Sequence, residues 1–247
     1  MDQLKVRIYA DGAVLSDMMA AYRTGFVSGF TTNPSLMKKA GVTDYVAFAK
    51  KVVERIPNLP LSFEVFADDF ETMEKEADKI HALGKNVFIK IPITNTKGES
   101  TIPLIRRLEK KGYSLNVTAI FTTKQVEETV KALSPAFENI VSVFAGRIAD
   151  SGIDPIPYMK KAVEICHAKR GAQLLWASTR EVFNVYEADW LGVDIITCPP
   201  GVIEKLKKVG KTLEQGSLDT VIGFNRDIQK LGFSILTDDE KAQFHKK

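Results

Sequence analysis

The sequence predicts a single α/β barrel made of eight strand–helix units. The chain has 247 residues, of which 45% are hydrophobic and 26% charged. That composition is ordinary for a folded protein with a large core and excludes disorder as the main state. Short apolar runs alternate with longer amphipathic segments along most of the chain. No G-x-G-x-x-G sequence follows any of these runs, and no Walker loop is present, so a doubly wound sheet is the less favoured alternative.

Eight apolar runs rich in Val, Ile and Phe have the composition of buried parallel strands. They are residues 5–10, 26–31, 61–67, 86–93, 114–121, 139–144, 173–177 and 193–198. Each run is short enough for one strand crossing a barrel wall. A strand–helix unit repeated eight times over about 200 residues is the pattern of a (β/α)8 TIM barrel.

The segments between the strands have helical periodicity. In residues 69–83, Phe70, Met73, Ala77 and Ile80 fall on one face, and residues 122–133, 157–168 and 182–191 follow the same pattern. Five glycines lie where helix C-caps are expected, shortly before a strand. They are Gly25, Gly84, Gly112, Gly171 and Gly192. Residues 216–247 are expected to form extra C-terminal helices, so that 1–247 is one barrel domain with a helical extension.

Charge and cysteine content restrict the function classes. Lys and Arg total 34 against 31 acidic residues, an unclustered excess that favours neither nucleic acid nor a membrane as a partner. Cys166 and Cys198 cannot form a disulfide framework. We find neither a signal-peptide pattern nor a run of 18 apolar residues, so a cytoplasmic location is expected. The three histidines lie in helix-like or tail segments, which argues against a histidine-rich metal site or a Ser-His-Asp triad.

Lys90 is the most informative polar residue, because it lies inside the apolar run 86–93. Burying an ammonium group is costly unless its pKa falls or it is paired. A neutral amine is a nucleophile toward carbonyls and can form a Schiff base. On this run alone, two other interpretations stay open: a lysine at a strand end with its ammonium in solvent, or a structural ion pair.

Polar residues also mark the ends of the neighbouring strands, where barrel active sites are built. They are Asp11, Asn33, Glu64, Asn116, Thr118, Ser142, Arg147, Ser178 and Arg180. Singly, each has a structural explanation, such as a helix N-cap for Asp11 or a strand former for Thr118. Structural ion-pair layers also occur in barrels, so their convergence indicates a site and leaves the reaction open.

Five segments together resemble the transaldolase family, class I aldolases that use a Schiff-base lysine on a (β/α)8 barrel. They are GFTTNPSL at 29–36, VFIKIP at 87–92, NVTAIF at 116–121, SVFAGRI at 142–148 and ASTR at 177–180. The resemblance runs from about residue 8 to residue 206. Their order and spacing make the set specific, although no single segment is decisive.

The resemblance implies catalytic roles for four residues. Lys90 would attack the C2 ketone of a ketose, and the protonated imine would act as the electron sink, so no cofactor is expected. Asp11 would take the proton of the C4 hydroxyl as the C3–C4 bond breaks. Glu64 would act as acid and base through a water held partly by Thr118.

The resemblance also implies that the partner is a small anionic sugar. Arg147, Ser178 and Arg180 would form the pocket for its distal phosphate, for which arginine suits because its planar donors bind bidentately. The full set of expected substrate-binding residues is Thr32, Asn33, Asn116, Ser142, Phe144, Arg147, Trp176, Ser178 and Arg180.

Two positions favour transfer over simple cleavage within the family. Fructose-6-phosphate aldolases, which release dihydroxyacetone, usually have Gln in place of Glu64 and Tyr in place of Phe144. The default donors are sedoheptulose 7-phosphate and fructose 6-phosphate. Glu181 departs from the amide or imidazole usual after Arg180, and its carboxylate would repel a dianion, so 6-deoxy-6-sulfofructose is an alternative donor. Trp176 and the loop 95–100 also differ from the common form of the family.

Two other classes of protein stay open as alternatives. One alternative is a lysine-dependent aldolase of the deoxyribose-phosphate type, or an isomerase, in which Asp11 and Glu64 are dispensable. Another is a non-catalytic binding or regulatory relative with an unreactive Lys90. No metal is expected, because the acidic residues are scattered and the lysine makes one unnecessary. A homo-oligomer is expected, with the segment after Gly216 as the candidate contact.

Overall fold

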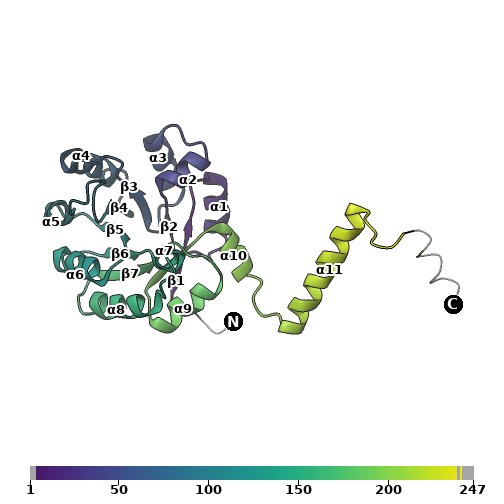
Figure 1. The fold of residues 1–247 in the computed structure, drawn as a ribbon. Helices are drawn as coiled ribbons and strands as arrows, with labels where there is room; N and C mark the ends of the chain where they lie inside the picture. Colours follow the sequence, from purple (N-terminus) through teal and green to yellow (C-terminus); the bar gives the residue numbers. More distant parts are fainter. Residues whose placement is uncertain (1–3, 238–239, 241–247) are drawn as a thin grey trace. The chain divides into compact units, whose positions relative to one another are not determined.

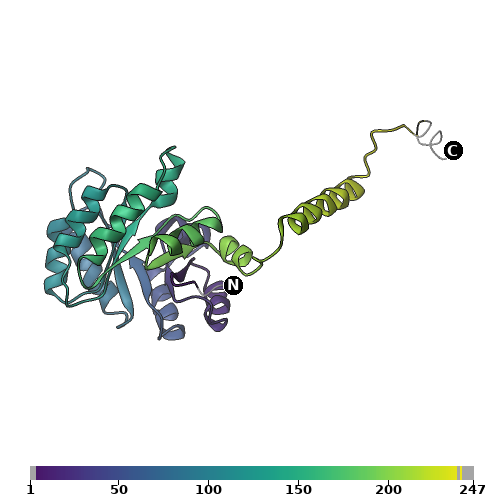
Figure 2. The ribbon, with the colours of Figure 1, turned by 90° about the horizontal axis from the view of Figure 1, so that it is seen from below.

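Eight parallel strands close into a barrel in the order in which they occur along the chain. The computed structural model describes residues 4–237 and 240. Most helices of the barrel unit lie outside the ring of strands, as the two perpendicular views show (Figures 1 and 2). The expected (β/α)8 TIM barrel is confirmed. Within the described residues, no helix is long and apolar enough to cross a membrane.

Each of the eight expected strands is present, and most are shorter than the apolar run that predicted them. They are β1 (Arg7–Asp11), β2 (Gly29–Thr31), β3 (Leu61–Glu64), β4 (Val87–Pro92), β5 (Leu115–Ile120), β6 (Asn139–Val143), β7 (Ala172–Trp176) and β8 (Ile195–Cys198). The largest differences are at β2, which has three residues in place of the expected six, and at β3, which has four in place of the expected seven. The pairing of β2 with β3 joins only Phe30 to Leu61 and Thr31 to Ser62.

The helices of the barrel unit alternate with the strands. They are α1 (Leu15–Arg23), α2 (Pro34–Lys39), α3 (Tyr45–Arg55), α4 (Phe70–His81), α5 (Ile102–Lys110), α6 (Thr123–Ala132), α7 (Ala145–Asp150), α8 (Ile156–His167), α9 (Phe183–Leu191) and α10 (Pro200–Leu206). Side-chain caps fix several of their starts. The Asp69 carboxylate accepts a hydrogen bond from the backbone N–H of Thr72 at the start of α4, and Thr122 and Gln125 form a reciprocal capping box on α6.

Four of the five glycines expected to follow helices adopt the left-handed conformation that glycine favours. Their φ values are +65° at Gly25, +81° at Gly112, +83° at Gly171 and +78° at Gly192. Gly84 does not, and the C-cap of α4 is Ala82, so the expected C-cap at Gly84 is displaced by two residues. A Cβ at Gly84 would lie 2.7 Å from the Val53 side chain, so close packing explains the glycine there.

Alternation along the strands separates two apolar layers. Residues such as Phe30, Phe63 and Ile89 point outward and belong to the large core between strands and helices. A smaller cluster, which includes Tyr9 and Leu175, fills the barrel interior. Because successive side chains face opposite sides of a strand, a polar residue next to an outward apolar one points into the barrel.

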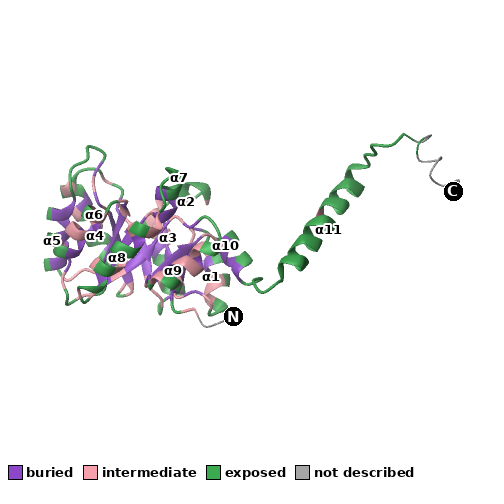
Figure 3. Ribbon diagram, turned by 60° about the horizontal axis from the view of Figure 1, so that its bottom comes forward, coloured by how far each residue is buried: buried purple, intermediate pink, exposed green. Residues whose placement is uncertain are grey.

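The C-terminal unit, Lys208–Lys247, is distinct from the barrel unit. Its helix α11 (Leu213–Leu231) begins three residues before the expected boundary at Gly216. Thr212 and Gln215 form a capping box at its start, and Gly232, with φ +66°, ends it. None of its residues is buried (Figure 3). At 100° per residue, its apolar side chains share one half of the surface. They are Leu213, Leu218, Val221, Ile222, Phe224, Ile228 and Leu231.

Candidate active site

A cavity of about 470 Å³ lies at the carboxyl ends of the barrel strands. Parallel strands all end at this face, so residues far apart in sequence meet there. Ten of the expected site residues line it: Asp11, Asn33, Glu64, Lys90, Thr118, Ser142, Phe144, Arg147, Ser178 and Arg180. The convergence predicted from the strand ends is therefore present.

Lys90 and Glu64 form the inner end of this cavity. Strand register pairs the two residues directly across β3 and β4. Lys90 Nζ lies 3.0 Å from Glu64 Oε2, and the two side chains are only 8% and 17% exposed. Lys90 Nζ also donates a hydrogen bond to the backbone oxygen of Thr32, at 3.1 Å. The amine is thus buried, fixed by two partners, and next to a carboxylate that can exchange a proton with it.

Asp11 lies at the same end of the cavity, and its carboxylate is held in place by hydrogen bonds from residues of the neighbouring strands β2 and β8. The Thr31 hydroxyl donates to Asp11 Oδ1 at 2.9 Å, and a 2.5 Å hydrogen bond joins the hydroxyls of Thr31 and Thr197. Burial raises the pKa of Asp11 above its usual value, an effect opposed by the charge of Lys90 and the Thr31 hydrogen bond, while Glu64 raises it further. A carboxylate in this setting takes up a proton more readily than one in water.

Beneath the cavity wall lies a chain of polar side chains inside the barrel. The Asn116 amide donates to Ser62 Oγ at 2.9 Å, and Ser142 Oγ donates to Asn116 Oδ1 at 2.7 Å. Asn116 is fully buried and does not line the cavity. Thr32 is also buried, with its hydroxyl bonded to the backbone oxygen of Ser62 at 2.9 Å, so only its backbone oxygen reaches Lys90. In this structure both side chains support the cavity wall, and their expected contacts with substrate stay predictions.

Trp176 is not among the residues that line the cavity, so nothing in this structure supports its expected contact with substrate, which stays a prediction. It belongs to the outward-facing core, while its neighbours Leu175 and Ala177 point into the barrel. The reason is strand alternation: Trp176 is one residue out of phase with the inward positions of β7. Its side chain is 1% exposed and packs between β7 and the helices.

The outer end of the cavity carries two arginines. The Arg147 guanidinium lies 5.1 Å from the centre of the Phe144 ring, which in turn stacks on Phe121. Arg180 donates from Nη1 to the backbone oxygen of Ser178 at 2.9 Å, and its Nε and Nη2 bind the two carboxylate oxygens of Asp150. Two planar donor groups at one end of the cavity suit an anionic group of the substrate.

A close approach of two backbone segments fixes this outer end. A Cβ at Gly146 would lie 1.7 Å from the backbone oxygen of Ser178, so only glycine fits there. Ser178 itself has φ +67°, a conformation that side chains rarely adopt. The start of α7 and the loop after β7 are therefore packed together, and they carry Arg147 and Arg180 respectively.

Reasoning from sequence missed four residues of the site. Thr31 and Thr197 orient Asp11, Ser62 supports Asn116, and Asp150 pairs with Arg180. Thr31, Ser62 and Thr197 could have been found as polar residues at inward positions of apolar strands. Asp150 lies 30 residues from Arg180, and no local pattern indicated their pairing. Glu181, which motivated the alternative donor, is exposed and does not line the cavity.

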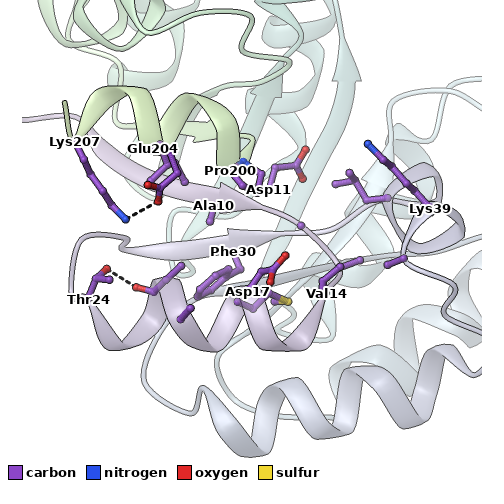
Figure 4. A pocket seen from close by; sticks show the side chains of 18 residues that line it. Ala10, Asp11, Val14, Asp17, Thr24, Phe30, Lys39, Pro200, Glu204 and Lys207 are labelled. Atoms are coloured by element: carbon purple, nitrogen blue, oxygen red, sulfur yellow. Dashed lines mark hydrogen bonds and ion pairs between the residues drawn. The ribbon is translucent and has the colours of Figure 1, made fainter. Parts of the chain in front are cut away.

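A second cavity of about 550 Å³ lies outside the barrel wall, among α1, α2 and α10 (Figure 4). Its walls are mainly apolar, with Ala10, Val14, Phe30 and Pro200 among the labelled residues. Lys207 forms an ion pair with Glu204 at its rim. The cavity has no buried lysine, so we place the chemistry inside the barrel.

The described residues hold no group of three or more His, Cys, Asp or Glu side chains placed to bind a metal ion. Cys166 and Cys198 are buried and unpaired, and burial raises the pKa of each thiol to about 12. Thiols with such a pKa are poor nucleophiles near neutral pH. Among the nucleophilic side chains discussed, Lys90 is the one placed to react.

Solved structures with a similar fold are barrels that match most of the chain. The 3-hexulose-6-phosphate synthase from Salmonella typhimurium has a TM-score of 0.56 at 16% identity, over 83% of this chain and 98% of that one. KGPDC from Streptococcus mutans has a TM-score of 0.55 at 13% identity, over 82% of this chain and 91% of that one. At these identities, the likeness shows the fold alone.

Curated relatives are closer in sequence. A probable transaldolase of Erythrobacter litoralis is 34% identical over 232 residues, covering 94% of this chain and all of that protein. A probable transaldolase of a Roseiflexus species is 35% identical over 201 residues, covering 81% of this chain and 88% of that protein. The family model described as transaldolase/fructose-6-phosphate aldolase matches residues 8–244. These names support transaldolase-type activity, and the chain belongs to the transaldolase/fructose-6-phosphate aldolase family.

Proposed function

We propose that this protein is a transaldolase that moves a three-carbon dihydroxyacetone unit from an anionic ketose to an aldose phosphate. The observation that carries the proposal is Lys90, a buried amine 3.0 Å from the Glu64 carboxylate at the inner end of a cavity whose outer end has two arginines. Sedoheptulose 7-phosphate and fructose 6-phosphate are the default donors, and 6-deoxy-6-sulfofructose is an alternative.

The first half of the reaction forms the Schiff base. The neutral Lys90 amine adds to the C2 carbonyl, and the resulting carbinolamine loses water to give a protonated imine. Glu64 is placed to take a proton from the amine and to protonate the departing hydroxyl. The Thr118 hydroxyl is buried, lines the cavity and has no hydrogen-bond partner among the described residues, so it can bind the water in this step.

The second half breaks the carbon–carbon bond. Asp11 accepts the proton of the C4 hydroxyl, the C3–C4 electron pair moves into the imine, and the aldehyde fragment leaves. The enamine that stays on Lys90 then adds to the carbonyl of the acceptor aldose, with Asp11 returning the proton to the new hydroxyl. Hydrolysis of the imine releases the product ketose and restores the amine. The raised pKa of Asp11 supports both proton transfers.

Borohydride trapping tests the Schiff base directly. The full chain is incubated with fructose 6-phosphate, reduced, digested and analysed by mass spectrometry. We expect an adduct with the mass of a dihydroxyacetone fragment on Lys90, and no adduct in Lys90→Met. Lys39→Met removes a lysine of the second cavity and should leave the adduct unchanged. Labelling of lysines other than Lys90 would contradict the proposal.

The same incubation separates transfer from simple cleavage. A transaldolase retains the enamine until an acceptor arrives, so free dihydroxyacetone should not accumulate without an aldose. Continuous release of dihydroxyacetone would identify a fructose-6-phosphate aldolase, the other activity in the name of the family. Glu64 and Phe144, which both line the cavity, support transfer by their resemblance to transaldolases.

We also propose a homo-oligomer in the cytoplasm. The exposed apolar side chains of α11 support an interface with another copy, because a stripe of this extent is unusual on a monomer. Two unpaired buried cysteines are typical of a reducing compartment.

A further inference from the structure

The backbone oxygen of Glu64 lies where the hydrogen-bond ladder between β2 and β3 is interrupted. The N–H of Thr32 donates to the oxygen of Ser62 at 3.2 Å, and two residues earlier the ladder makes the corresponding bond at 2.9 Å. Donors recur at every second residue of a parallel strand, so the next bond would join the N–H of residue 34 to the oxygen of Glu64. Residue 34 is a proline, which has no N–H. The ladder therefore cannot supply a donor to Glu64.

Tyr45 supplies the donor in place of the ladder. Its hydroxyl donates to the backbone oxygen of Glu64 at 2.8 Å. Tyr45 is the first residue of α3, and Asp44 fixes that start by accepting a 2.9 Å hydrogen bond from the N–H of Ala47. Burial and the charge of Glu64 raise the pKa of Tyr45, and the hydrogen bond to the backbone opposes them. The phenol therefore keeps its proton and stays a donor near neutral pH.

The ring of Tyr45 packs on two residues close to Glu64 in the chain. Its centre lies 6.2 Å from that of Phe63, in an edge-to-face arrangement, and 4.5 Å from that of Phe66. Phe63 is fully buried in the outer core, while Glu64, the next residue, lines the cavity. The hydroxyl and the ring of Tyr45 therefore hold the same end of β3.

The backbone of Glu64 determines where its carboxylate meets Lys90. Glu64 is the last residue of β3 and is paired with Lys90 across β4. The N–H of Val65 donates to the backbone oxygen of Lys90 at 3.1 Å, which holds this end of β3 on the side of β4. Tyr45 holds it on the opposite side. Loss of the Tyr45 hydrogen bond would free that side of the strand end, and with it the carboxylate that lies 3.0 Å from Lys90 Nζ.

We propose that Tyr45 is a positioning residue that sets the reach of Glu64 toward Lys90 in the formation and hydrolysis of the Schiff base. The inference rests on the proposed function, because Glu64 is the acid and base of those steps. Tyr45 is not among the residues that line the cavity, and it acts through Glu64. It has no part in breaking the C3–C4 bond, which is the step assigned to Asp11.

Timed borohydride trapping of the full chain with saturating fructose 6-phosphate separates these steps. The intact ketose and the three-carbon fragment give Lys90 adducts of different mass. Tyr45→Phe removes the hydroxyl and keeps the ring. We expect total adduct to form about tenfold more slowly than in wild type, less than the roughly 10²-fold that a displacement of about 1 Å can cost. The six-carbon adduct should not accumulate, because cleavage is unaffected. In Asp11→Asn it should accumulate.

Tyr113→Phe is the matched control. Its hydroxyl donates to Asp78 at 2.9 Å on the outer side of the barrel, and its loss should leave the rate unchanged. Glu64→Gln should slow adduct formation at least as much as Tyr45→Phe, and combining the two should add little, because both act through one carboxylate. A wild-type rate in Tyr45→Phe, six-carbon adduct accumulating in it, or independent losses in the double variant would each overturn the inference.

A second carbonyl compound separates this failure from failure of the proposed function. If wild-type protein forms no Lys90 adduct with fructose 6-phosphate or with 6-deoxy-6-sulfofructose, the proposed function is overturned. Pyridoxal 5′-phosphate, an anionic aldehyde that forms Schiff bases with lysines, still tests Tyr45. After reduction and peptide mapping, the Lys90 adduct should form more slowly in Tyr45→Phe than in wild type or Tyr113→Phe. Equal rates, or no Lys90 adduct in any of the three proteins, would contradict the inference.

Discussion

At each end of the barrel cavity a lining residue is held in an ion pair, and the two pairs differ in burial. Lys90 and Glu64 are 8% and 17% exposed, while Arg180 and Asp150 are 46% and 52% exposed. The inner pair is built on adjacent strands, and the outer pair joins α7 to the loop after β7. Burial makes an unpaired charge at the inner end costly, so each of the two charged groups depends on the other. Solvent screens the outer pair, so the two outer charges attract each other less strongly than the inner charges do.

The largest expected effect is the loss of kcat in Asp11→Asn, at the inner end of the cavity. Loss of the carboxylate should reduce kcat by about 10²–10⁴-fold, the range for a general base. Because burial raises the folded-state pKa of Asp11, its contribution to stability is present at low pH and lost as the pH rises through that pKa. Asp11→Asn should therefore keep or raise the Tm at pH 8. A fall in both kcat and Tm would show that Asp11 is mainly structural.

Thr31→Val sharpens the same prediction without removing the carboxylate. The Thr31 hydrogen bond lowers the pKa of Asp11, so its loss should raise that pKa and move the acid limb of the kcat/KM profile to higher pH. Thr129→Val, at a buried threonine of α6, is the control and should leave the profile in place. An identical profile for all three proteins would remove Asp11 from the rate-determining proton transfer.

The outer end is tested by Gly146→Ala, where a smaller effect is expected. The new Cβ would lie 1.7 Å from the backbone oxygen of Ser178, so the two segments must separate. We expect the donor KM to rise about tenfold while kcat falls less, with a stability loss of about 1–3 kcal/mol from overpacking. Steady-state kinetics and thermal unfolding measure both. Gly201→Ala, whose Cβ meets nothing within 4 Å, is the matched control.

Equal losses of kcat and kcat/KM in Gly146→Ala would break the comparison, because they would show that the outer end shapes the transition state as well as binding.

The smallest effect on either end is expected from α11. Val221→Glu, Phe224→Glu and Ile228→Glu together place charges on its apolar half and should reduce the oligomeric state seen by analytical ultracentrifugation. The Lys90 adduct should persist. Arg226→Glu with Lys230→Glu changes charge on the opposite half of the helix and should not alter the assembly. Unchanged sedimentation of the triple variant would contradict the proposed interface.

The sequence predicted the inner end better than the outer end, for a physical reason. Lys90 and Glu64 stand out because a charged residue inside an apolar strand must point into the barrel. Trp176 is apolar and gives no such signal of its direction; strand alternation places it in the outer core. Helical and strand periodicity therefore predicted the fold and most of the cavity wall.

The outer end depends on contacts between distant segments, which no local pattern reveals. Asp150 binds Arg180 across 30 residues, and Gly146 is required by the backbone of Ser178. The sequence predicts Asn116 and Thr32 as site residues, but their depth below the cavity wall follows from hydrogen bonds made across three strands. The sequence alone shows that these residues are polar, but it does not show whether their side chains line the cavity or lie beneath its wall.

The contact between Gly146 and Ser178 has a consequence for exchanging parts between related enzymes. Residues 144–150 and 177–184 fit each other through one shared backbone approach, so they behave as a paired cassette. Grafting either segment alone into a relative would bring mismatched backbones together. Grafting both would carry the two arginines and Asp150 as a unit, while the strands that hold Lys90, Glu64 and Asp11 stay those of the recipient. Tail preference could then be recombined separately from the bond-breaking chemistry.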